Sequence, residues 1–94
     1  MASASWNGKT LALSDDVEVV EGNSYFPPDS IMWEHFQESN TETICPRKGT
    51  AHFYHIKVEG QVNVDAAWTY HEPKDAAKPI KNFVAFWRGV EVKG

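Results

Sequence analysis

The chain has 94 residues, a formal charge of −4 and one cysteine. A domain of this length buries roughly 60–70% of the surface of its unfolded chain, enough for one core without staples. A lone cysteine excludes an internal disulfide and favours a reducing compartment. We therefore predict a single domain over residues 1–94, with residues 1–5 flexible, in the cytoplasm.

The charge pattern excludes two classes of partner. Acidic residues gather in the first half of the chain, and no run of lysine or arginine forms the basic stripe of a nucleic-acid binder. No stretch reaches the roughly 18 apolar residues of a membrane helix. The start lacks the basic and apolar segments of a signal peptide. We expect no nucleic acid and no membrane as partner, and a monomer or weak homodimer.

Short strands and one helix are predicted in the first half. Two runs, 9–13 and 17–21, flank Ser-Asp-Asp at 14–16, a composition typical of a hairpin turn. Two prolines and an aspartate then favour a helix over 29–38, where apolar residues recur at a loose helical spacing. This helix is short, so packing must stabilise it.

The second half reads as strands separated by turns. The predicted strands cover 43–45, 50–58, 61–64, 66–70, 82–87 and 90–92, with turns at 46–49, 59–60 and 88–89 and a loop over 73–79. Many short strands with one helix indicate a mainly β fold: a small twisted antiparallel sandwich or open barrel.

Aromatic side chains are the strongest functional signal. Tyrosine and tryptophan need a partner for their polar atoms when buried, and rings from several strands form a natural pocket wall. Core packing is the alternative for each ring taken singly. With one cation and one imidazole added, the predicted ligand-binding set is Tyr25, Lys48, His52, Tyr54, Trp68 and Tyr70.

The turn at 46–49 carries the two weak candidates for catalysis. Lys48 precedes Gly49, where backbone N–H groups can converge on an anion; a solvated turn lysine is the alternative. Cys45 near this cation would have a lowered pKa and could act as a nucleophile; a small buried apolar residue is the alternative. Glu21 and Glu72 are candidate acids or solvated carboxylates.

The histidines do not predict a metal site. His52 and His55 are three residues apart in a strand and so point to opposite faces. A trio of Cys45, His52 and His71 follows no known ligand spacing. We predict no metal and no cofactor.

Four spaced motifs are similar to those of one family. They are, in order, Tyr25-Phe26-Pro27, Thr43-x-Cys45-Pro46-x-Lys48-Gly49-x-Ala51-x-x-Tyr54, Ala67-Trp68-x-Tyr70-x-x-Pro73 and Phe83-x-Ala85-Phe86. Over residues 9–92 the chain resembles the family catalogued as domain of unknown function four-two-seven, which carries a nucleotidyltransferase-like label.

The resemblance implies a β-tent-like fold, the group that holds Mss4-like proteins and methionine sulfoxide reductase B. Zinc-binding members use two Cys-x-x-Cys pairs, and this chain has only Cys45, so their zinc does not carry over. The paired carboxylates of a nucleotidyltransferase and the glycines of a Walker loop are also absent from the sequence.

The predicted function is binding of a small-molecule ligand in an aromatic pocket with Lys48 and Cys45 at its rim. The first alternative is an enzyme acting on a small substrate, either thiol-dependent or nucleotidyltransferase-like. The second is a protein-interaction module that uses exposed Trp6, Trp33 or Trp87.

Overall fold

A computed structural model describes residues 1–94, mostly as β-strands in three antiparallel sheets. The strands are β1 (Ala2–Trp6), β2 (Lys9–Ser14), β3 (Glu18–Val20), β4 (Asn23–Tyr25), β5 (Phe36–Cys45), β6 (Gly49–Val58), β7 (Gln61–Thr69), β8 (Val84–Phe86) and β9 (Glu91–Lys93). Three short 3-10 helices, η1 (Pro28–Ser30), η2 (Trp33–His35) and η3 (Asp75–Ile80), connect them. The mainly β, antiparallel prediction is confirmed. No helix has the length and apolar character needed to cross a membrane.

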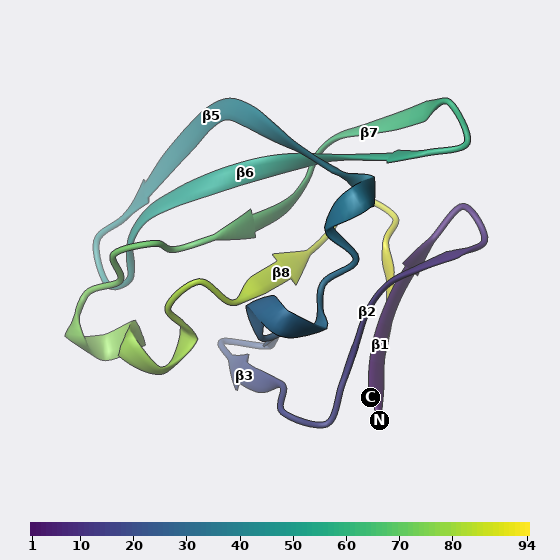
Figure 1. Cartoon of the computed structure of the whole chain (residues 1–94). Helices are drawn as coiled ribbons and strands as arrows, with labels where there is room; N and C mark the ends of the chain where they lie inside the picture. The colour runs from purple at the N-terminus through teal and green to yellow at the C-terminus, as the bar shows by residue number, and fades with distance from the viewer.

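The sheet β5-β6-β7-β8 forms the frame of the molecule (Figure 1). Phe26 extends it beyond β8, because its N–H and C=O exchange two hydrogen bonds of 2.8 Å with Val84. A second sheet, β2-β1-β9, brings the two ends of the chain side by side, with Ser3 opposite Lys93. The hairpin β3-β4 is the third sheet.

Residues that alternate along the strands of this sheet belong to two different apolar clusters. The larger cluster contains Phe26, Val84 and Phe86 and packs against residues of β1 and β2. The smaller contains Tyr25 and Ala85, which are the neighbours in sequence of those residues. Because successive side chains of a strand point to opposite faces, the two clusters lie on opposite faces of the sheet. The candidate site is found with the smaller cluster.

The predicted helix over 29–38 is wrong. Residues 28–30 and 33–35 form the separate turns η1 and η2, and the chain is already in strand β5 from Phe36. Between the two turns, Ile31 pairs with Ala12, and the Met32 N–H donates to the carbonyl of Leu11 at 2.8 Å. Tertiary pairing with β2 thus overrides a weak helical preference in a segment too short to form a helix alone.

The predicted hairpin at 14–16 is also wrong. Strand β2 pairs with β1 across Asn7-Gly8, and β3 pairs with β4 across Glu21-Gly22. All four turn residues have positive φ, between 50° and 83°, which is the backbone twist that suits a two-residue hairpin. Pairing through Asn7-Gly8 makes β1 the central strand of its sheet, with Ala4 fully buried, where the sequence predicts a flexible start.

The predicted turn over 46–49 is confirmed, since β5 ends at Cys45 and β6 begins at Gly49. Gly49 has a φ of +114°, and a Cβ built there would lie 3.2 Å from the backbone oxygen of Glu72. At Gly60, with a φ of +80°, a Cβ would meet nothing within 4 Å. Both glycines have a positive φ, which disfavours other residues, but only at Gly49 would an added Cβ also meet a neighbouring atom.

We expect Gly49→Ala to lower the free energy of unfolding by about 2–3 kcal/mol, and Gly60→Ala by about 1 kcal/mol. Urea denaturation of both variants measures the difference. Equal losses would show that the approach of Glu72 to the turn imposes no constraint.

Candidate functional site

A hollow of about 250 Å³ opens beside the smaller apolar cluster. Rings dominate its wall, with three polar side chains and one alanine among them. Its lining residues are Asn23, Tyr25, Thr43, Lys48, Ala51, Phe53, Trp68, Tyr70 and Trp87.

Strand register explains why these residues share one face. Across the sheet Phe53 is the partner of Trp68, and Trp68 is the partner of Ala85. Partners in an antiparallel ladder point to the same side. Residues two apart from them in the sequence, including Tyr70 and Trp87, follow on that side.

The rings surround Trp68. Its ring centroid is 5.7 Å from that of Trp87, 6.3 Å from that of Phe53 and 6.2 Å from that of Tyr25, the last at 90°. The Trp68 indole N–H donates to the Tyr25 hydroxyl at 3.3 Å, and Tyr25 is fully buried. This hydrogen bond fixes the orientation of the indole. Such edge-to-face pairs are each worth about 0.5–1.5 kcal/mol beyond burial. The wall is therefore pre-formed.

Lys48 brings a nearly buried cation into this wall, with 11% of its side chain exposed. Its ammonium forms an ion pair with one carboxylate oxygen of Glu21, and the other oxygen accepts from Arg47 at 3.0 Å. The hydrogen bond to Glu21 raises the pKa of Lys48, and the same bond lowers the pKa of Glu21. Both groups stay charged at neutral pH. The ammonium is thus fixed in place, as a site for a polar group of a ligand requires.

Two hydrogen bonds from Lys74 hold the turn that carries this cation. The Lys74 N–H donates to the carbonyl of Lys48 at 2.8 Å, and its ammonium donates to the carbonyl of Pro46 at 2.9 Å. The turn over 46–49 is therefore attached to the segment that precedes η3. Its backbone is not free to move the lysine out of the hollow.

Cys45 is half-buried next to this turn and packs against the smaller apolar cluster. The nearby backbone N–H groups of Arg47 and Lys48 lower the pKa of the thiol. A lowered pKa is typical of a reactive thiol, and the contact with the apolar cluster is typical of an inert one.

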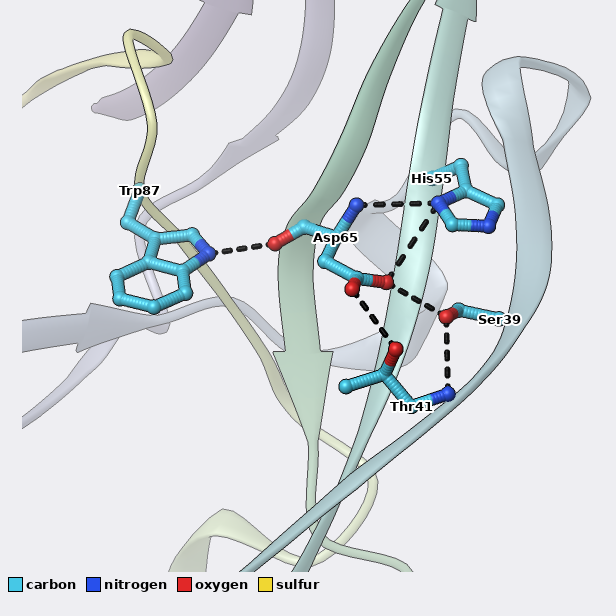
Figure 2. Close-up of polar contacts among 5 residues, drawn as sticks. All are labelled: Ser39, Thr41, His55, Asp65 and Trp87. Atoms are coloured by element: carbon cyan, nitrogen blue, oxygen red, sulfur yellow. Dashed lines mark hydrogen bonds and ion pairs between the residues drawn. The ribbon is translucent and has the colours of Figure 1, made fainter.

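Trp87 is held at the mouth of the hollow by a polar clamp centred on Asp65 (Figure 2). The Trp87 indole N–H donates to the backbone oxygen of Asp65 at 2.5 Å. The Asp65 carboxylate accepts hydrogen bonds from the hydroxyls of Ser39 and Thr41, at 2.5 and 2.8 Å. The backbone N–H of Asp65 donates to Nδ1 of His55 at 3.0 Å. Strands β5, β6 and β7 and the residue after β8 thus meet at one aspartate.

The clamp coincides with irregular strand pairing. Register shifts occur between Glu38 and Glu42 in β5 and between Tyr54 and Ile56 in β6, and Asp65 has a φ of +53°. Such bulges bend a sheet and re-aim side chains. The hydrogen bond from the Ser39 hydroxyl lowers the pKa of Asp65 most, and the hydrogen bond from Thr41 lowers it further. The carboxylate is therefore charged at neutral pH.

Two predicted ligand-binding residues, His52 and Tyr54, do not line this hollow. Tyr54 packs against Trp33 and Phe36, with ring centroids 5.5 and 5.8 Å away, and burial raises its pKa. His52 lies beside His71. Residues 52 and 54 alternate with 51 and 53, which line the hollow, so the expected face was off by one residue. The other four, Tyr25, Lys48, Trp68 and Tyr70, do line it.

The sequence analysis missed Asn23, Thr43, Phe53 and Trp87 as lining residues. A pairing of Phe53 with Trp68 would have identified Phe53, but strand register is not visible in one sequence. Of the candidate acids, Glu21 joins Lys48, whereas Glu72 lies at another recess near His52. The trio of Cys45, His52 and His71 does not form a group that could hold a metal.

One protein-family model matches nearly the whole chain. The family described as "Domain of unknown function (DUF427)", whose model is named NTP_transf_9, matches residues 2–93. The chain therefore belongs to this family, as the motifs around Tyr25, Cys45, Trp68 and Ala85 indicate. No curated protein matches the chain. The kinship with Mss4-like, β-tent proteins stays a prediction.

We expect Asp65→Asn to lower the free energy of unfolding by about 1–2 kcal/mol at pH 7, because two hydrogen bonds to a charged acceptor are weakened. Since folding lowers the pKa of Asp65, its stabilisation is present above the usual pKa and is lost as the pH falls through the folded value. The difference in free energy of unfolding between variant and parent, measured by urea titration, should become smaller toward acid pH. A gap that is constant with pH would contradict the assignment.

We expect the Cys45 thiol to react with iodoacetamide with a pH midpoint below that of a free thiol, about 8.5. The rate of alkylation of the folded protein from pH 6 to 9.5, followed by mass spectrometry, measures this. A model peptide thiol is the control. A midpoint at or above that of the peptide would contradict the role of the two backbone donors.

Proposed function

We propose that this protein binds a small planar molecule in the hollow between Trp68, Trp87 and Lys48. The observation that carries the proposal is unfilled space of about 250 Å³ inside a fixed aromatic wall. Small-molecule sites are usually concave, lined mainly by apolar and aromatic side chains, and carry a few polar groups. This hollow, with its indoles and an ion-paired ammonium, has that composition.

Size and shape restrict the ligand. Pockets for drug-sized ligands measure about 300–1,000 Å³, so a smaller hollow suits one or two fused rings. Trp87 is 43% exposed and lines the hollow. The guanidinium carbon of Arg88 lies over its ring, 4.6 Å from the centroid, so a planar ligand would stack on the other face of the indole. The ligand would thus be partly enclosed and partly in contact with water.

Charge favours an anionic substituent on that ring. Arg47 and Lys48 share the single carboxylate of Glu21, which leaves one net positive charge at this end of the hollow. The side chains of Asn23 and Thr43 add polar groups to the wall. A carboxylate or phosphate could therefore bind near Lys48 without leaving a buried charge unpaired.

A thiol-dependent enzyme is the second candidate, and the lowered pKa of Cys45 favours it. Cys45 ends the strand next to the turn that carries Lys48, although it is not among the residues that line the hollow. Nucleotidyl transfer has less support, because no aspartate or glutamate lines the hollow and magnesium ions need such oxygen ligands there.

We also propose that the protein works in the cytoplasm, as a monomer or weak homodimer. Its one free thiol is compatible with a reducing compartment. The interaction-module hypothesis has less support at Trp6, which is half-buried against the larger cluster.

The test of the proposal uses small aromatic carboxylates as probes, with the matching neutral amides for comparison. We expect the carboxylates to shift amide resonances of residues 48, 51, 53 and 68 in NMR titrations, and to bind at least tenfold more tightly than the amides. Trp87→Ala should weaken binding at least fivefold, and Lys48→Met should remove the preference for the carboxylate.

Trp33→Ala is the matched control, because Trp33 is also 43% exposed, also donates its indole N–H to a backbone oxygen, and lies outside the hollow. It should leave binding unchanged. Native mass spectrometry of the purified protein searches for a molecule that is retained. If no probe shifts the hollow residues, or if Trp33→Ala weakens binding as much as Trp87→Ala, the proposal fails.

A further inference from the structure

Two imidazoles lie together outside the hollow. His52 belongs to β6 and His71 follows the end of β7, and their ring centroids are 5.0 Å apart with the planes at 37°. His52 alternates along β6 with Ala51 and Phe53, so it points to the face opposite the hollow. Nothing in the aromatic site uses either ring.

An oxygen lies near Nδ1 of each ring, but only that of Asn82 is within hydrogen-bond distance. The Nδ1 of His71 is 2.9 Å from Oδ1 of Asn82, and the Nδ1 of His52 is 3.7 Å from Oε2 of Glu42. The Asn82 amide oxygen accepts a hydrogen bond from Nδ1–H of His71, which leaves the lone pair of that neutral ring on Nε2. Neither Nε2 atom has a hydrogen-bond partner within the protein. For His71 this is the arrangement by which an outer partner orients a histidine ligand of a metal.

The residues that carry these two oxygens are themselves held by the backbone. Glu42 is the direct strand partner of His52 in the pairing of β5 with β6. Asn82 has a φ of +64° and donates its N–H to the carbonyl of Tyr70 at 2.9 Å, which places it beside His71. The orientation of the His71 ring is therefore set before any ligand arrives, and Glu42 lies next to His52.

A polar recess of about 550 Å³ borders the two rings, and no apolar side chain lines it. Glu42 and Glu72 lie in its wall, and Lys74 is the one basic side chain there. The ammonium of Lys74 is engaged with the carbonyl of Pro46. The recess thus offers two carboxylates against one cation, which favours positively charged ligands.

We propose that His52 and His71 bind one divalent transition ion of the zinc, nickel and copper class through their Nε2 atoms. An ion about 2.0–2.1 Å from both nitrogens, with tetrahedral geometry, places the ring centres about 5 Å apart, as the two rings already are. Imidazole nitrogen selects these ions over calcium and magnesium.

The site has open coordination positions. No third histidine, cysteine, aspartate or glutamate lies close enough to complete a group of three. Water in the recess would fill the remaining positions, and an exchangeable anion could replace it. Affinity is then lower than that of a closed structural zinc site. Because the site uses neither Cys45 nor the aromatic wall, it stands or falls independently of the proposed ligand-binding function.

The experiment titrates the full chain, without a histidine tag, with ZnCl₂ and NiCl₂ by calorimetry at pH 7.5. We expect one ion per chain, at least a tenfold loss of affinity in His52→Ala and in His71→Ala, and an affinity within twofold of the parent in the matched control His35→Ala. Mg²⁺ should give no binding. Absence of stoichiometric Zn²⁺ and Ni²⁺ binding, or an equal loss in His35→Ala, would overturn the proposal.

A second measurement needs no variant. In the unmodified protein, Zn²⁺ should shift the imidazole C–H resonances of His52 and His71 more than that of His35. Shifts confined to other residues would place the ion elsewhere and overturn the assignment, even if a calorimetric signal is found.

Discussion

The ion pair between Lys48 and Glu21 is the constraint on which the candidate ligand site depends. It joins the turn after β5 to the turn between β3 and β4, which are separate hairpins of different sheets. A cation with little solvent exposure costs free energy unless a counter-charge is near. If either turn moved, the ion pair would break and the nearly buried ammonium of Lys48 would lose its counter-charge. This link keeps the β3-β4 hairpin, and with it Tyr25, against the aromatic face of the large sheet.

The two faces of that sheet differ in how completely they are covered. Strands β1 and β2 contribute to the larger cluster on one face, where Phe26, Ile56 and Val84 have no exposed surface. On the other face, β4 and η3 contribute Tyr25 and Ile80 to the smaller cluster, and the rings beyond them line the hollow. The Asp65 clamp then bends β5, β6 and β7 together and fixes Trp87 at its border. Incomplete cover and a bent sheet together make the space.

Sequence patterns predicted the parts of this structure that depend on local chemistry. Alternating apolar residues and the turn at Pro46 and Gly49 identified most of β6 and its boundaries, and the ring-rich motifs identified Tyr25, Trp68 and Tyr70. The errors share one cause, which is pairing between distant segments. Bridging of Ile31 to Ala12 replaced a helix, and the register of β6 on β7 put Phe53 in the hollow in place of Tyr54. The Asn7-Gly8 dipeptide is a local hairpin signal, and it forms the turn between β1 and β2.

Strand β6 carries residues of both candidate sites, since Ala51 and Phe53 face the hollow and His52 faces His71. A central strand is hydrogen-bonded on both sides, here by β5 and β7, so its backbone has few alternative arrangements. Coupling between two sites requires an element with two discrete states that each ligand stabilises differently. Strand β6 places the two candidate sites next to each other, but it is not an element with two discrete states. One rigid strand can therefore carry an aromatic ligand site on one face and an imidazole pair on the other, with each site free to function alone.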